Sequence, residues 1–132
     1  MNQLTEIEER RKQRRKQTAE VFTPIWLAQQ MIDKLPEECW IDPTKTALEP
    51  ACGNGVFIEL MILKKLEFGS TIKQAVETIY GIDLMPDNVE ETKQKVKTLI
   101  LKHGGDESLF HIVERNIICG DALKVDFDEI FK

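Results

Sequence analysis

The residues best suited to chemistry lie in one short run, LEPACGNGVF at positions 48–57. Residues 46–48 have the apolar character of a short strand, and residues 56–63 carry apolar side chains at helical spacing. Gly53 and Gly55 therefore lie where a strand meets a helix. Glycine lets the backbone turn tightly and approach a ligand, and the positive end of the following helix faces that ligand. The run predicts a cofactor cradle.

The residues around this turn indicate which cofactor the cradle would hold. A nicotinamide dinucleotide fingerprint requires a third glycine, where this chain has Ile58. Glu49 would also repel a pyrophosphate, whereas it could hold an ammonium group while the helix N-terminus holds a carboxylate. A zwitterionic amino-acid tail fits these groups better, and S-adenosylmethionine carries such a tail. A generic nucleotide-binding α/β turn is the alternative.

The run closely resembles motif I of class I S-adenosylmethionine-dependent methyltransferases, in the version found in adenine-N6 DNA methyltransferases of restriction-modification systems or phages. The resemblance implies that the chain binds S-adenosylmethionine or its product S-adenosylhomocysteine. The cofactor contacts that it implies within the motif are Glu49, Ala51, Gly53, Asn54 and Gly55.

A second strand-to-helix junction follows the sequence IYGID at positions 79–83. Ligands of open α/β sheets bind at the carboxyl ends of the strands, where Asp83 could accept both hydroxyls of a ribose. Leu84 is predicted to lie in the same site. The alternative is that Asp83 caps the next helix, although residues 86–88, with the sequence PDN, already supply that role.

A third apolar strand ends in an acid within IICGDAL at positions 117–123. This segment resembles the third motif of the same family, in which the aspartate accepts a hydrogen bond from the adenine amino group. The backbone of the next residue then lies near the ring. The resemblance carries these roles to Asp121 and Ala122, and a surface turn is the alternative for Asp121.

Upstream, Phe22, Thr23 and Pro24 precede an amphipathic stretch. A threonine N-cap with proline at the first helical position would be enough to explain Thr23 and Pro24. The phrase also resembles motif X of the family, which lies against the methionine end of the cofactor. Its position before the glycine turn follows the order of adenine-N6 enzymes with an N-terminal motif X. Phe22 and Thr23 are therefore predicted cofactor contacts.

The resemblance covers about residues 17–123, and the family's catalytic motif would follow on the next strand. That motif is an Asn or Asp, two prolines and an aromatic residue, and it binds the flipped adenine. None of the five prolines of this chain is adjacent to another. Asp126 and Asp128 resemble a solvated acidic turn more than a pair of bases. We assign no catalytic residue and expect the chain alone to be inactive.

Three functions agree with these motifs. The leading hypothesis is the S-adenosylmethionine-binding portion of an adenine-N6 DNA methyltransferase, which transfers a methyl group only when the catalytic half is supplied. The second is a non-catalytic protein that sequesters the cofactor or modulates a methyltransferase or restriction partner. The third is a nucleic-acid or protein interaction module with a degenerate cofactor site.

The order of elements needed to position these residues is helix, strand, helix, helix, strand, helix, strand. With right-handed crossovers it predicts an α/β fold, a Rossmann-like three-layer half-domain. The sheet would be mostly parallel, of about three strands, with flanking helices on both faces. The resemblance implies that residues 17–132 form an incomplete S-adenosylmethionine-binding methyltransferase domain after the arm.

The strand at residues 47–48 would lie at an edge of the sheet. An uncovered edge of a parallel sheet exposes backbone donors and acceptors, and proteins rarely leave it bare. We therefore expect cover from a second copy in a homodimer, from a separate polypeptide that carries the catalytic half, or from the C-terminal segment.

Charge is distributed unevenly along the chain. The net charge of the 132 residues is −5, yet residues 1–16 form a basic N-terminal arm. A weak contact with DNA phosphates is the functional interpretation of this arm, and a solvated helix is the alternative. The basic residues of the arm are Arg10, Arg11, Lys12, Arg14, Arg15 and Lys16.

Composition is that of a soluble globular chain, with 42% hydrophobic and 31% charged residues. No stretch approaches ~20 consecutive apolar residues, and the N-terminus is charged, so we expect no membrane span and a cytoplasmic location. Cys39, Cys52 and Cys119 are odd in number and lack a Cys-x-x-Cys pair. We therefore expect buried thiols and neither a disulfide framework nor a zinc site.

Overall fold

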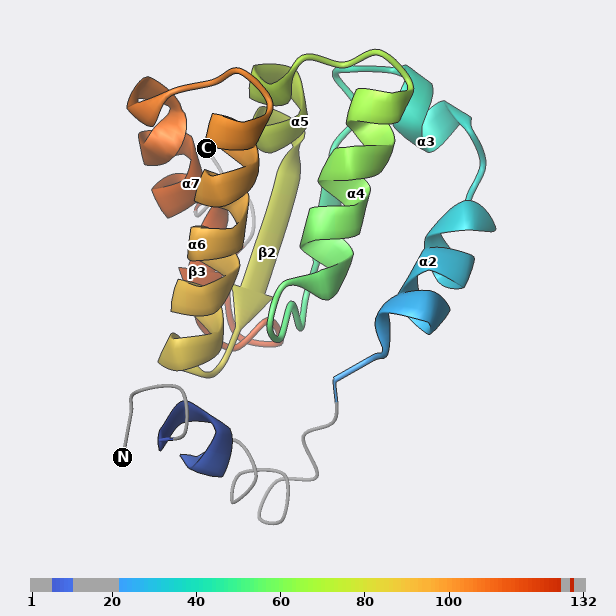
Figure 1. Ribbon diagram of the computed structural model, residues 1–132. Helices are drawn as coiled ribbons and strands as arrows, with labels where there is room; N and C mark the ends of the chain where they lie inside the picture. The colour runs from blue at the N-terminus through green and yellow to red at the C-terminus, as the bar shows by residue number, and fades with distance from the viewer. Residues whose placement is uncertain (1–5, 11–21, 127–128, 130–132) are drawn as a thin grey trace.

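The computed structural model describes residues 6–10, 22–126 and 129. Strands β1 (Ala47–Glu49), β2 (Ile79–Asp83) and β3 (Ile117–Cys119) form one sheet in the order β1-β2-β3, and both pairs are parallel (Figure 1). β2 is the central strand, since Gly81 pairs with residues of both neighbours. The structure thus confirms the predicted Rossmann-like α/β half-domain.

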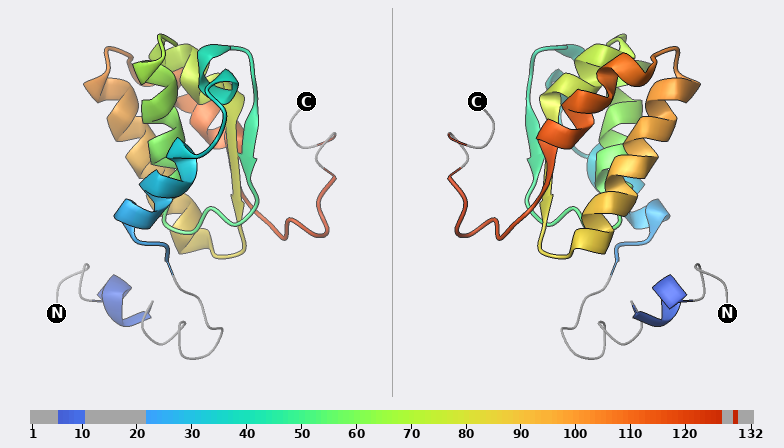
Figure 2. Two further views of the ribbon diagram at one scale, coloured as in Figure 1. Left: turned by 90° about the vertical axis from the view of Figure 1, so that its right-hand side faces the viewer. Right: turned by 90° about the vertical axis from the view of Figure 1, so that its left-hand side faces the viewer.

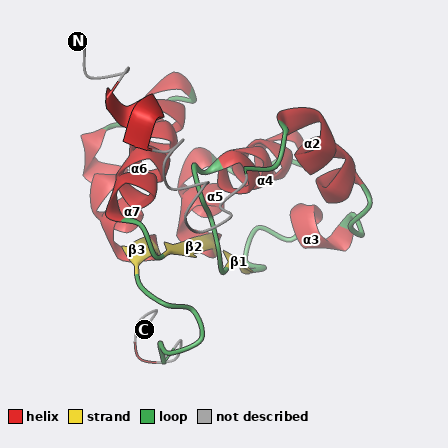
Figure 3. Cartoon of the chain, turned by 90° about the horizontal axis from the view of Figure 1, so that it is seen from below, coloured by secondary structure: helices red, strands yellow, loops and turns green. Residues whose placement is uncertain are grey.

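Helices precede and connect these strands. Their bounds are α2 (Ile25–Asp33), α3 (Glu38–Ile41), α4 (Val56–Glu67), α5 (Ile72–Thr78), α6 (Pro86–Lys102), the 3-10 helix η1 (Glu107–Leu109) and α7 (Phe110–Asn116). Right-handed crossovers that step twice in the same direction place their helices on one face of a sheet. Figure 3 shows the described helices that connect the strands on that single face. The sequence predicted helices on both faces, and the chain after β3 runs along the other side instead (Figure 2).

The helical layer packs closely on the sheet. Ile58 of α4, Ile100 of α6 and Ile117 of β3 are almost fully buried in one apolar core. At Gly81, a Cβ atom would lie 3.1 Å from Ile58 Cδ1 and 3.3 Å from Ile117 Cδ1, both tight contacts. The absent side chain therefore lets α4 approach the centre of the sheet.

The sequence did not predict α3, η1 or α7. Elements of one or two turns carry little periodicity, and tertiary contacts stabilise them. Asp106 Oδ1 accepts a hydrogen bond from Ser108 N at 2.9 Å and thereby caps η1. Asn116, at the end of α7, donates from Nδ2 to Val76 O at 3.0 Å.

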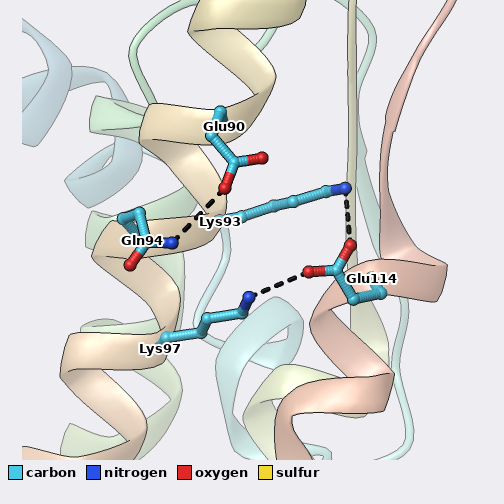
Figure 4. Close-up of polar contacts among 5 residues, drawn as sticks. All are labelled: Glu90, Lys93, Gln94, Lys97 and Glu114. Atoms are coloured by element: carbon cyan, nitrogen blue, oxygen red, sulfur yellow. Dashed lines mark hydrogen bonds and ion pairs between the residues drawn. The ribbon is translucent and has the colours of Figure 1, made fainter.

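An ion-pair cluster joins α7 to α6 (Figure 4). Glu114 Oε2 lies 2.7 Å from Lys93 Nζ, and Glu114 Oε1 lies 2.9 Å from Lys97 Nζ. Hydrogen bonds from these two lysines lower the pKa of Glu114 below its usual value. Because Glu114 is half exposed, each pair contributes about 0.2–1 kcal/mol. The cluster helps to orient the helix that leads directly into β3.

Three further predictions concern the basic arm, membrane spans and the cysteines. Residues 6–10 are helical and Arg10 is exposed, while the other basic residues of the predicted arm lie outside the described residues. Within the described part, no helix is both long and apolar enough to cross a membrane. The three cysteines are free thiols, but only Cys52 is buried, and Cys119 is exposed.

Candidate functional site

The turns that follow the three strands meet at one edge of the sheet, the lower edge in Figure 1. Two backbone hydrogen bonds tie the outer turns to the end of β2. Cys52 N donates to Ile82 O at 2.8 Å, and Gly120 N donates to Asp83 O at 2.9 Å. The three predicted motifs therefore share one site at the carboxyl ends of the strands.

Asp83 is the polar centre of this edge. Its Oδ2 accepts from Gly53 N at 2.9 Å, and its Oδ1 accepts from Met85 N at 2.9 Å and from Asn88 Nδ2 at 3.2 Å. The carboxylate thus holds the glycine turn and the start of α6 together. A carboxylate has about four acceptor positions, so these bonds leave one for a ligand hydroxyl. Asp83 accepts more hydrogen bonds from the chain itself than the sequence indicated. Binding of both ribose hydroxyls by Asp83 stays a prediction.

The glycine turn has the tight backbone that the sequence predicted. Gly53 and Gly55 have φ angles of +53° and +90°, in the left-handed region that favours glycine. A Cβ atom on Gly55 would lie 2.9 Å from Thr92 Oγ1, and one on Gly53 would lie 3.2 Å from two ring atoms of Phe22. The absent side chains thus also make room for α6 and for Phe22, and the predicted close approach to a ligand stays a prediction.

The N-terminus of α4 opens toward the same edge. The helix begins at Val56, its N-cap is Gly55, and no side chain caps it. The N–H groups of a first helical turn have no partner within the helix, and with the helix dipole they attract an anion. A ligand carboxylate is therefore favoured beside Asn54 and Val56.

A hollow of about 420 Å³ lies on one side of Asp83, and we call it the Asp121 hollow. Leu84 and Leu123 form an exposed apolar rim. Asp121 Oδ1 accepts from Leu123 N at 2.9 Å, so Asp121 also stabilises a surface turn, as the alternative interpretation held. The lining residues are Pro50, Ala51, Asp83, Leu84, Met85, Gly120, Asp121, Ala122 and Leu123.

A smaller hollow of about 220 Å³ lies on the other side, and we call it the Phe22 hollow. Ala51 and Asp83 line both hollows, so the two adjoin at Asp83. Thr23 lines this hollow and is not the N-cap of α2, which is Pro24. The lining residues are Phe22, Thr23, Ala51, Cys52, Gly53, Asn54, Val56, Phe57 and Asp83.

Nine of the eleven predicted site residues line these two hollows, and Glu49 and Gly55 do not. Glu49 lines a third hollow along β1, which shares Phe57 with the Phe22 hollow. Its Oε1 accepts from Ala51 N at 3.1 Å, and burial raises the pKa of Glu49 above its usual value. Contact between Glu49 and a ligand ammonium group therefore stays a prediction.

Sequence reasoning missed the buried polar side chains that support the site. Asn88 and Thr92 of α6 are fully buried, and Thr92 Oγ1 donates to Gly53 O at 3.2 Å. Asn88, Thr92 and the buried Val96 are spaced four residues apart and so lie on one face of α6. Polar residues on the apolar face of this helix could have indicated from the sequence that Asn88 and Thr92 are buried. Burial raises the pKa of the Cys52 thiol to about 12, which favours the neutral thiol.

The described residues contain no group of three or more His, Cys, Asp or Glu side chains that could hold a metal ion. No protein-family model, curated protein or solved structure matches the chain.

Proposed function

We propose that the chain binds S-adenosylmethionine or S-adenosylhomocysteine in the Asp121 and Phe22 hollows. One observation carries the proposal: a carboxylate, Asp83, lies between a larger apolar-rimmed hollow and a smaller one beside a helix N-terminus. The cofactor has its parts in the same order, a planar base, a ribose and a charged amino-acid tail. Ligand sites of open α/β sheets occur at this edge.

In this proposal the adenine occupies the Asp121 hollow, with Leu84 and Ala122 against the ring. The hollow has a volume of about 420 Å³, and small-molecule sites have volumes of ~300–1,000 Å³. The ribose binds Asp83 through its remaining acceptor position. The methionine tail occupies the Phe22 hollow, where its carboxylate meets the first turn of α4.

We further propose that this binding serves adenine-N6 methylation of DNA, with the chain as the cofactor-binding portion of the methyltransferase. The order of the motifs supports this proposal. The 132 residues contain no adjacent prolines, so we expect no methyl transfer until a polypeptide with the catalytic motif is added. A protein that only binds the cofactor would use the same site. Adding the polypeptide with the catalytic motif distinguishes the two functions, because only the methyltransferase portion would then support methyl transfer.

Calorimetric titration with S-adenosylhomocysteine tests the binding proposal. We expect saturable binding to one site per chain and a loss of about ten- to a hundredfold in affinity for Asp83→Ala, or ~1.5–3 kcal/mol. The matched control is Asp106→Ala, which also removes a carboxylate but lines neither hollow, and it should keep the wild-type affinity. Equal affinities of the wild type and Asp83→Ala would contradict the proposal, as would the absence of saturable binding.

A further inference from the structure

Asn88 is a fully buried polar side chain beside the candidate site. It lies in the first turn of α6 and is 0% exposed, although asparagine is mostly found at protein surfaces. Burying an amide is unfavourable unless new hydrogen bonds replace those that it made with water. A buried asparagine on the apolar face of a helix therefore indicates a specific partner.

The carboxylate of Asp83 is such a partner. Asn88 Nδ2 donates to Asp83 Oδ1 at 3.2 Å, and the same oxygen accepts from Met85 N at 2.9 Å. The other oxygen, Oδ2, accepts from Gly53 N at 2.9 Å. A carboxylate has about four acceptor positions, two on each oxygen. The three donors within the described chain therefore leave one position, on Oδ2.

The direction of α6 brings the amide to this carboxylate. The Cα–Cβ bonds of an α-helix tilt toward its N-terminus, so a side chain in the first turn of α6 reaches back to the end of β2. The sequence predicted that residues 86–88 cap this helix. Its N-cap is Met85 instead, and no side chain caps it. The amide of Asn88 thus serves Asp83 and not the helix end.

Asn88 and a ligand would approach Asp83 from different sides. Asp83 lines both hollows, whereas Asn88 lines neither. Because Asn88 has no exposed surface, the acceptor position that it fills on Oδ1 is closed to a ligand. This leaves Oδ2 as the oxygen that can accept from a ligand hydroxyl.

Loss of the amide would make Asp83 a poorer acceptor. Hydrogen bonds to a charged group are stronger than those between neutral groups, and a buried acceptor without its donor is costly. Without Asn88, two donors instead of three would hold the carboxylate, and Oδ1 would lose its donor on the side that water does not reach.

We propose that Asn88 is a positioning residue for ribose recognition. Its amide holds Asp83 so that Oδ2 accepts from a sugar hydroxyl, and the site thereby favours ribonucleosides over nucleosides whose sugar lacks hydroxyls. This inference rests on the proposed function, since it requires a nucleoside at Asp83. It gives Asn88 an effect on ligand selectivity in addition to any effect on stability.

Two nucleosides that differ only in the sugar test the inference on the full chain: adenosine, and dideoxyadenosine, which lacks both ribose hydroxyls. In NMR titrations of the wild type we expect adenosine to bind about tenfold more tightly. In Asn88→Leu this ratio should fall to about threefold, because adenosine binds more weakly while dideoxyadenosine binds as before.

Asn116→Leu is the matched control. Asn116 is also a buried asparagine, 1% exposed, and it donates from Nδ2 to Val76 O at 3.0 Å. It lines neither hollow. The control should lose stability and keep the wild-type ratio, whereas a purely structural role of Asn88 would make the two variants behave alike.

Asn88→Asp is a second variant, which keeps nearly the same shape. Its new carboxyl can donate to Asp83 Oδ1 when protonated and repels Asp83 when ionised. We expect the ratio for this variant to fall between about pH 6 and about pH 8 while the wild-type ratio stays constant. If Asn88→Leu does not fold, this pH profile decides alone.

The possible failures are distinguishable. A wild-type ratio in folded Asn88→Leu would overturn the inference and leave the proposed function standing, as would a ratio in Asn88→Asp that does not change with pH. An equal fall of the ratio in Asn116→Leu would also overturn the inference. No saturable binding of adenosine to the folded wild type would overturn the proposed placement of the nucleoside together with the inference.

Discussion

The two ends of the parallel sheet use polar side chains in opposite ways. At the carboxyl end Asp83 accepts hydrogen bonds from Gly53 and Met85, and hollows remain on both sides of it. At the amino end Lys65 donates from Nζ to Lys45 O and to Thr78 Oγ1, and Lys65 is only 1% exposed. The carboxyl end thus holds an acceptor, Asp83, beside two hollows, and the amino end holds a donor, Lys65, that is buried.

The directions of the helices explain this difference. α4 and α6 begin at the carboxyl end, where unpaired N–H groups and positive dipole ends favour a carboxylate. α5 and α7 end at the amino end, where the amide of Asn116 donates to the carbonyl of Val76 in the last turn of α5. Lys65 donates there to the loop carbonyl of Lys45 and to the hydroxyl of Thr78. The N-termini of α4 and α6 therefore attract anions at the carboxyl end of the sheet. We infer that the carboxyl end serves the ligand and the amino end serves stability.

The largest expected effect is on stability at the amino end. Lys65→Ala removes a buried side chain and leaves Lys45 O and Thr78 Oγ1 without their donor, so we expect about 3 kcal/mol less free energy of unfolding in urea titration. Lys65→Met keeps most of the stem and should lose about half as much. Its affinity for S-adenosylhomocysteine should match the wild type. Unchanged stability of Lys65→Ala would show that the buried lysine at the amino end does not stabilise the fold.

A smaller effect is expected at the glycine turn. Gly55→Ala forces a side chain into a left-handed backbone and against Thr92, and we expect it to lower the free energy of unfolding by about 2–3 kcal/mol. Gly69→Ala is the matched control: its φ is +103°, but no atom lies within 4 Å of the added Cβ. The control should lose about 1 kcal/mol. Equal losses would show that contact with Thr92 costs nothing.

The smallest effect concerns pH dependence at Glu49. Burial raises the pKa of Glu49 in the folded chain above its ordinary value of 4.5, so the folded state favours the protonated form. The stability that this contributes is present below about pH 4.5 and is lost as pH rises through the folded pKa. Relative to Glu49→Gln, the wild type should become less stable across that window in urea titrations. A difference between the two that stays constant with pH would refute the burial of this carboxyl.

The sequence predicted the three strands, because each is apolar and ends near a polar turn, and it placed Asp83 at the carboxyl end correctly. It did not predict that Asp83 binds Gly53 N, thirty positions away, since hydrogen bonds across turns exist only in the folded chain. No pattern in the sequence indicated that Lys65 is buried. A lysine in an amphipathic helix usually faces solvent, and its partners Lys45 and Thr78 come together only through the sheet.

We propose that the hollows on either side of Asp83 hold one cofactor. A crystal structure of the chain with S-adenosylhomocysteine would show whether they do. We predict the adenine between Leu84 and Ala122, a ribose hydroxyl within hydrogen-bond distance of Asp83, and the amino-acid carboxylate at the first turn of α4. A ligand bound in the third hollow along β1, or bound with its adenine against Phe22, would contradict the account.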